Sequence, residues 1–121
     1  NTTEKKVYLL KAYAGMDSML INAVCDLGAD GLVIEALGAG NLQPQTVSAV
    51  RNCIKKSIPV VFVSRAFNVV TQDVYDYEGG GKRFQQDGVI FTTGLSGQKA
   101  RVKLMILLEA GISFEKLGKL F

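Results

Sequence analysis

The sequence has no histidine and no tryptophan, and it has only two cysteines and two prolines among its 121 residues. Without histidine the chain lacks the usual general base at neutral pH, which excludes a self-contained Ser-His or Cys-His hydrolase. It also lacks the mixed Cys/His set that many zinc sites use, so we expect no metal and no cofactor. Chemistry based on threonine, lysine or tyrosine stays open.

Long apolar runs and blocks of charge are missing as well. No run approaches the roughly 20 residues needed to cross a bilayer, and no stretch resembles a signal peptide, so we expect one soluble domain with no membrane partner. The hydrophobic share of 48% fits a compact core. The net charge is +3, and the basic positions are interleaved with acidic ones. We therefore expect no nucleic-acid partner.

The cysteines, Cys25 and Cys53, lie in separate stretches with helical periodicity. We expect them to be thiols of the core that need not pair. The sequence does not determine the compartment, although the cytoplasm is favoured over export.

Short apolar runs rich in β-formers alternate with helical patterns. Strands are expected at residues 7–13, 31–37, 58–65 and 87–94. Helices are expected at 17–28, from Pro44 through Ile54, at 96–111 and at 113–121. This alternation implies right-handed crossovers, so the predicted fold class is α/β, a three-layer sandwich with a mostly parallel sheet of Rossmann-like or flavodoxin-like type.

Spacing also predicts which helical residues face inward and which residues cap the helices. Asp17 or Ser18 would cap the first helix, Ser96 the third, and Gly28 and Gly111 would end them. The inward positions are expected to be Leu20, Ala23, Val24 and Leu27; Val47, Val50 and Ile54; Ala100, Leu104, Leu107 and Leu108; and Phe114, Leu117 and Leu120.

Two glycine-rich segments invite a nucleotide-binding interpretation, and both fail it. In "EALGAGNLQP" the third glycine of a dinucleotide fingerprint is replaced by Gln43, and no acidic residue stands about 20 positions on. In "YEGGGKRF" a P-loop would need glycine at Asp76 and Ser or Thr at Arg83. What remains is position, because ligands of parallel sheets gather at the carboxyl ends of strands. Asn41 lies after such an end and can orient a polar ligand, but asparagine before a helix is more commonly an ordinary cap or turn residue.

Several stretches together carry a family resemblance. "DGLVIEALGAGNL", "IPVVFVSR", "TQD" and "GLSGQKARVKLMILL" resemble, in this order and spacing, the C-terminal domain of the bacterial L-asparaginase/glutaminase family. The similarity runs from about Val7 to Gly111. It implies a two-domain amidohydrolase that converts L-asparagine to L-aspartate and ammonia with a threonine nucleophile and no metal.

In this family the catalytic groups belong to the N-terminal domain, which is absent from this chain. The resemblance thus implies that residues 1–121 are a single C-terminal domain, that residues 1–6 end an interdomain linker, and that the chain has no catalytic residue. Its threonines, which stand in none of the family's catalytic contexts, are Thr2, Thr3, Thr46, Thr71, Thr92 and Thr93.

The resemblance also implies a homodimer or homotetramer in which this domain contributes to the neighbouring subunit's substrate pocket. Asn41 matches the asparagine of the G-x-G-N loop, which helps to hold the substrate there. Tyr75 stands where some members have a glutamate that binds the substrate's α-amino group. A phenol can accept a hydrogen bond from the ammonium but forms no ion pair, and Asp76 and Glu78 are alternatives.

Two other interpretations stay open. The chain could be a stand-alone domain that binds a small ligand without chemistry, or an asparaginase-like subunit of a tRNA-dependent amidotransferase. A preceding domain with T-G-G-T and D-T motifs would favour the asparaginase.

Overall fold

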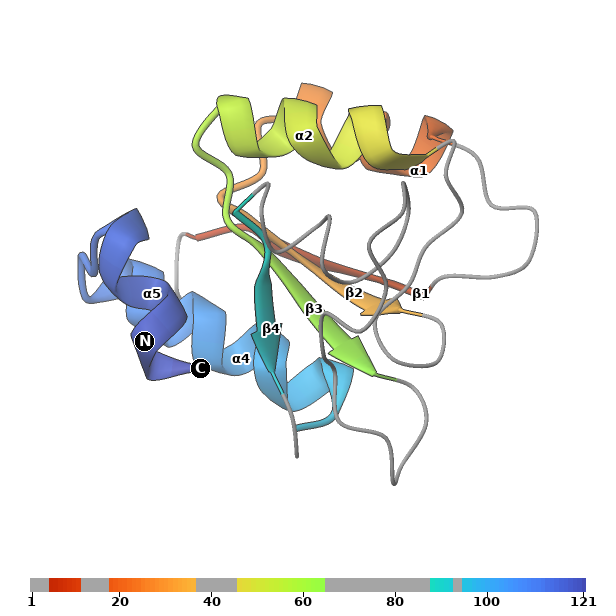
Figure 1. The fold of residues 1–121 in the computed structure, drawn as a ribbon. Helices are drawn as coiled ribbons and strands as arrows, with labels where there is room; N and C mark the ends of the chain where they lie inside the picture. The colour runs from red at the N-terminus through yellow and green to blue at the C-terminus, as the bar shows by residue number, and fades with distance from the viewer. Residues whose placement is uncertain (1–4, 12–17, 37–45, 65–87, 93–94) are drawn as a thin grey trace.

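The computed structural model describes residues 5–11, 18–36, 46–64, 88–92 and 95–121. Within these ranges the strands form one parallel sheet in the order β1-β2-β3-β4. The strands are β1 (Val7–Lys11), β2 (Gly31–Ala36), β3 (Val60–Ser64) and β4 (Ile90–Thr92). The predicted α/β class with a parallel sheet is confirmed (Figure 1).

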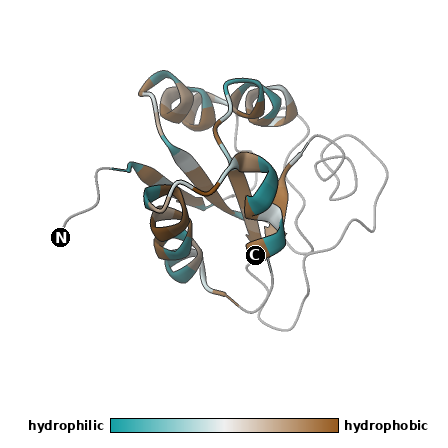
Figure 2. Ribbon diagram, turned by 90° about the vertical axis from the view of Figure 1, so that its left-hand side faces the viewer, coloured by the Kyte–Doolittle hydropathy of each residue, from teal (hydrophilic) through white to brown (hydrophobic). Residues whose placement is uncertain are grey.

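The helices lie on both faces of this sheet (Figure 1). They are α1 (Met19–Asp26), α2 (Val47–Lys55), α4 (Gly97–Glu109) and α5 (Phe114–Leu120). Helices α1 and α2 cover one face, and α4 and α5 cover the other. Figure 2 shows the sheet between the two helical layers, with the apolar colour gathered toward it.

Two apolar clusters fill the spaces between the layers. Successive side chains of a strand point to opposite faces, so Leu32 and Ile34 pack under α1 and α2, whereas Val33 packs under α4. Strand β3 divides in the same way, with Phe62 in the first cluster and Val61 in the second. The three-layer arrangement follows from this burial of both faces.

The start of β1 is held to β2 by hydrogen bonds of Lys6 and Asp30. The backbone N–H of Lys6 donates to Asp30 Oδ2 over 2.8 Å, and the Asp30 N–H donates to the Lys6 carbonyl over 2.8 Å. The neighbouring Val7 carbonyl instead accepts from Arg101 Nε of α4 over 2.7 Å. In the described sheet β1 pairs only with β2, so it is an edge strand.

The predicted inward face of α1 is largely wrong. The buried residues of this helix are Ile21, Val24 and Cys25. Leu20 is 43% exposed and Leu27 is 66% exposed. Of the four expected positions only Val24 is buried, and Ala23 is exposed as well. The helix is rotated so that Cys25 faces α2, a neighbour that spacing within α1 does not reveal.

The inward faces of the other helices are closer to expectation. Val47 and Val50 of α2 are fully buried, and Ile54 packs against their cluster. In α4, Ala100 and Leu104 are buried, with Leu107 and Leu108 packed beside them. In α5, Leu117 is buried, Phe114 is partly buried and Leu120 is exposed.

Most of the predicted helix ends are also observed. The Ser96 hydroxyl accepts from the Lys99 N–H over 3.1 Å and caps α4. Gly28 and Gly111 follow α1 and α4 with φ of 76° and 78°, the left-handed conformation typical of such ends. Ser18 precedes α1, but its side chain makes no capping hydrogen bond. Asp17 and Pro44 lie outside the described residues.

The expectation of unpaired thiols is contradicted by a disulfide between Cys25 and Cys53. Their Cα atoms are 5.7 Å apart, and both residues are buried in the first cluster. The bond joins α1 to α2 on one face of the sheet. Disulfides are typical of oxidising compartments.

We expect replacement of both cysteines by alanine to lower the free energy of unfolding by about 3–4 kcal/mol. The bond links residues 28 positions apart, and a loop of that size restricts the unfolded chain by roughly this amount. Urea unfolding followed by circular dichroism measures the change. As a control, a thiol reductant should lower the midpoint of the unsubstituted chain and leave the alanine variant unchanged. Equal midpoints for the oxidised and reduced chain would contradict the stabilising role.

Candidate functional site

The carboxyl ends of the strands meet at one edge of the sheet, because the sheet is parallel. Ala36 at the end of β2 pairs in register with Ser64 at the end of β3. Val63 pairs with Thr92 at the end of β4. Ala36 and Ser64, the last described residues before 37–45 and 65–87, therefore lie side by side at the edge where ligands of parallel sheets gather.

The predicted site residues belong to these two segments. Asn41 and Tyr75 lie outside the described residues, as do the alternatives Asp76 and Glu78. The structure gives the strand ends from which their segments start, Ala36 and Ser64, and does not place their side chains.

Glu35, one residue before the end of β2, contacts the beginning of α4. A Cβ atom placed on Gly97 would lie 2.8 Å from Glu35 Cγ and 2.9 Å from Cδ, with Oε1 closer still. Only glycine leaves room for this side chain at the first residue of α4. The free N–H groups and dipole of a helix N-terminus favour a carboxylate there. The side chain of Glu35 thus packs against the first residue of α4, near the end of β2 that precedes the segment with Asn41.

Sequence reasoning missed this contact between Glu35 and Gly97. The available signal was a glycine at the first helical position after a serine cap, where no unusual backbone conformation requires it. Lys11 pairs in register with Glu35 and stands beside it on the face that α4 covers. The carboxyl edge of the sheet thus carries two neighbouring side chains of opposite charge, Lys11 and Glu35, near the beginning of α4.

The two described threonines are buried. Thr46 has an exposed fraction of 0% and Thr92 of 4%, and both interact with other groups. The remaining threonines lie outside the described residues.

Among the described residues, no group of three His, Cys, Asp or Glu side chains is placed to hold a metal ion. None of the helices in the described part of the chain is long and apolar enough to cross a membrane.

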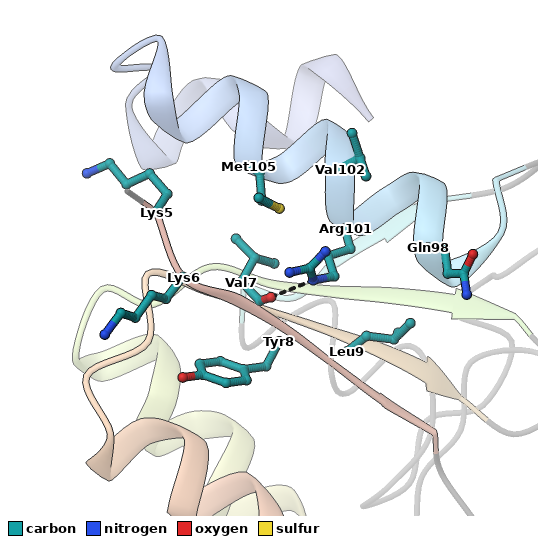
Figure 3. Close-up of a pocket in the computed structure, with 9 residues that line it drawn as sticks. All are labelled: Lys5, Lys6, Val7, Tyr8, Leu9, Gln98, Arg101, Val102 and Met105. Atoms are coloured by element: carbon teal, nitrogen blue, oxygen red, sulfur yellow. Dashed lines mark hydrogen bonds between the residues drawn. The ribbon is translucent and has the colours of Figure 1, made fainter. Parts of the chain in front are cut away.

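A separate groove runs along the outer side of β1, between that strand and α4 (Figure 3). Its volume is about 830 Å³. The lining residues are Lys5, Lys6, Val7, Tyr8, Leu9, Gln98, Arg101, Val102 and Met105. It lies at the side of the sheet, so it is distinct from the carboxyl edge described above.

Comparison with protein families gives one match that covers nearly the whole chain. Residues 6–121 match the model of the glutaminase/asparaginase C-terminal domain. The matched range includes every described strand and helix.

Comparison with curated proteins gives relatives of two kinds. The chain is similar to a probable L-asparaginase of Deinococcus radiodurans, with 38% identity over 99% of this chain and 36% of the relative. An L-asparaginase of Bacillus licheniformis is 28% identical over 84% of the chain and 32% of its own length. A glutamyl-tRNA(Gln) amidotransferase subunit from Pyrococcus furiosus is 31% identical over 87% of the chain and 24% of its own length. The chain thus spans about a third or less of these relatives.

Replacement of Gly97 by alanine tests the contact at the start of α4. We expect the free energy of unfolding to fall by about 1 kcal/mol, because the new methyl group displaces the Glu35 side chain from the helix N-terminus. Gly118→Ala is the matched control, since a Cβ there meets only an ordinary contact at 3.9 Å. It should stabilise α5 by up to about 1 kcal/mol.

A double-mutant cycle separates the contact from any general effect of the substitution. In a Glu35→Ala background the carboxylate is gone, so Gly97→Ala should cost little or nothing. Urea unfolding of the four proteins gives the coupling. Additive effects of the two substitutions would show that Glu35 and Gly97 do not interact.

Proposed function

Because the chain belongs to the glutaminase/asparaginase C-terminal domain family, we propose that it is the C-terminal domain of an L-asparaginase. The whole enzyme would convert L-asparagine and water to L-aspartate and ammonia. The observation that carries the proposal is the similarity, over 99% of the chain, to a probable L-asparaginase. The proposal concerns a longer protein, since the chain covers 36% of that relative.

The chemistry is assigned to a preceding N-terminal domain of the parent. Chain-specific support comes from the lack of histidine and from the burial of Thr46 and Thr92. In this proposal the chain contributes no nucleophile, and its role lies in assembly and in substrate binding.

The substrate-binding role falls to the carboxyl edge of the sheet. The strand order β1-β2-β3-β4 follows the sequence, so the described strands contain no reversal of order, the feature that opens a crevice in Rossmann-like sheets. A ligand bound at this edge therefore needs a second protein surface to enclose it. We assign that surface to the neighbouring subunit of a homodimer or homotetramer.

Two residues of this edge would reach the neighbour's pocket. Asn41 follows the end of β2, where Glu35 packs against Gly97 at the start of α4. Its amide has two donors and an acceptor, so it can hold both a polar group of the substrate and a neighbouring residue. Tyr75 follows β3, and its hydroxyl would accept a hydrogen bond from the α-ammonium group of L-asparagine.

A second candidate function has support of its own. The similarity to a glutamyl-tRNA(Gln) amidotransferase subunit covers 87% of the chain at 31% identity, which is compatible with a parent that releases ammonia for a tRNA-dependent reaction. The coding sequence upstream distinguishes the parents. A domain with T-G-G-T and D-T motifs alone favours the asparaginase, an additional tRNA-linked module favours the amidotransferase, and no such domain favours a small-ligand-binding domain.

The purified 121-residue chain should release no ammonia from L-asparagine, because the proposed nucleophile belongs to another domain. A coupled ammonia assay measures turnover directly. The full-length parent at the same molar concentration is the positive control. Turnover that copurifies with the chain and scales with its concentration would contradict the assignment.

In the full-length parent, Asn41→Ala should lower kcat/KM for L-asparagine about tenfold, since one hydrogen bond to a charged ligand contributes about 1.5 kcal/mol. Gln43→Ala is the matched control, because it removes another amide from the same segment and has no assigned contact. Steady-state kinetics and circular dichroism are measured on both variants. Unchanged kinetics in the Asn41 variant would refute its role in the pocket.

A further inference from the structure

Beyond the proposed enzyme function, we propose that the groove between β1 and α4 binds an acidic, extended segment of a partner polypeptide. The segment would add to the outer edge of β1 as a further strand. Three features of the described residues support this proposal: the free edge of β1, a guanidinium fixed beside it, and a lining that combines cations with apolar side chains.

The backbone of β1 offers a row of outward-facing groups. The N–H and C=O of Lys6 both point toward β2, where they bond Asp30 and Gly31. Backbone groups of an extended strand alternate in direction from residue to residue, so those of Val7 and Leu9 point away from β2. The Val7 carbonyl accepts from Arg101, which leaves the Val7 N–H and both backbone groups of Leu9 for an added strand. No described strand pairs with that side. Such an edge is a template for an added strand.

Arg101 provides a fixed carboxylate-binding group beside this edge. Its Nε donates to the Val7 carbonyl over 2.7 Å, and the side chain is partly buried. Figure 3 shows the guanidinium held over β1 by this bond. The bond uses only Nε, so the Nη groups are left for a ligand. A planar guanidinium matches the two oxygens of a carboxylate.

The charge of the groove selects the kind of partner. Its lining includes Lys5, Lys6 and Arg101 and contains no acidic residue. Lys6 is exposed at the beginning of the groove, and Arg101 lies on its α4 side. The side chain of Lys6 alternates with that of Val7, so it lies on the face of β1 away from α4 and Arg101. A segment with carboxylates on both sides would complement Lys6 and Arg101, whereas a basic segment would be repelled.

The apolar part of the surface suits side chains between the carboxylates. Val102 of α4 is 49% exposed and Ile106 is 62% exposed. A second hollow, lined by Gln98, Val102 and Ile106 among others, continues the groove along α4. An edge strand flanked by a helix is a recurring arrangement for binding extended peptides, in which backbone bonds give affinity and alternate side chains give specificity.

The probe for this groove is a fluorescein-labelled, acetylated peptide that repeats Glu-Glu-Val-Val, which places glutamate and valine on both sides of the added strand. Fluorescence anisotropy with the full 121-residue chain should give a Kd of about 100 µM at low salt, as expected for a short, flexible ligand. A peptide that repeats Lys-Lys-Val-Val should not bind. Free glutamate should not displace the probe. Displacement by free glutamate at concentrations near the peptide's Kd would identify a small-anion site and overturn the proposal.

Charge variants locate the binding surface. Lys6→Gln should weaken binding about threefold, and Arg101→Lys about fivefold, because lysine keeps the charge and loses the planar fork. Lys55→Gln is the matched control, since Lys55 is an exposed cation on α2, across the sheet from α4. Equal affinity in the Lys6, Arg101 and Lys55 variants would overturn the assignment of the groove.

Strand addition itself is tested on the probe, so that no variant of the chain has to fold. N-methyl groups are placed on every second residue of the peptide, in either of the two possible registers. One register should abolish binding because it removes the N–H groups that face β1, and the other should retain it. In a ¹⁵N-labelled chain the Leu9 amide should shift on binding. Retained binding in both registers, with no shift of Leu9, would overturn strand addition.

Discussion

Side chains of β2 point alternately to opposite faces of the sheet, yet Leu32, Val33 and Ile34 all have zero exposure. This is possible only when helices cover both faces. Helices α1 and α2 follow their strands and cover one face, so the chain after β4 has to return over the other face as α4. That return brings Gly97 against Glu35 and Arg101 against Val7. The proposed pocket wall and the groove beside β1 both follow from the double burial of β2.

The parts of the fold that depend on local pattern could be predicted from the sequence. Apolar runs such as "GLVIEAL" and "IPVVFVSR" identified β2 and β3, because a strand buried on both faces needs no alternation. Ser96 and Gly111 marked the ends of α4 for equally local reasons. The parts that depend on neighbours in space could not be predicted. The face of α1 was misjudged since Leu20 and Leu27 are apolar and exposed.

The disulfide could not be predicted from the sequence either, because it also depends on which residues are neighbours in space. Cys25 and Cys53 each occupy an ordinary core position in a helix, and nothing in the spacing within either helix indicates that the two Cα atoms lie 5.7 Å apart. The contact of Glu35 with Gly97 joins residues 35 and 97, which no local rule relates. For Asn41 and Tyr75, physical reasoning predicted only which chemical groups an amide or a phenol can bind. Their roles came from the resemblance, and they stay predictions because both lie outside the described residues.

Helix α4 connects the two surfaces that we assign to binding. Gly97 at its first residue contacts the end of β2, and Arg101 follows about one helical turn later beside β1. Ala100 and Leu104 between and beyond them are fully buried against the sheet. A shift of α4 along the sheet would therefore disturb both contacts and uncover this packing at once. The carboxyl edge of the sheet and the groove between β1 and α4 are thus both held in place by α4. The position of α4 is set in turn by the packing that buries β2.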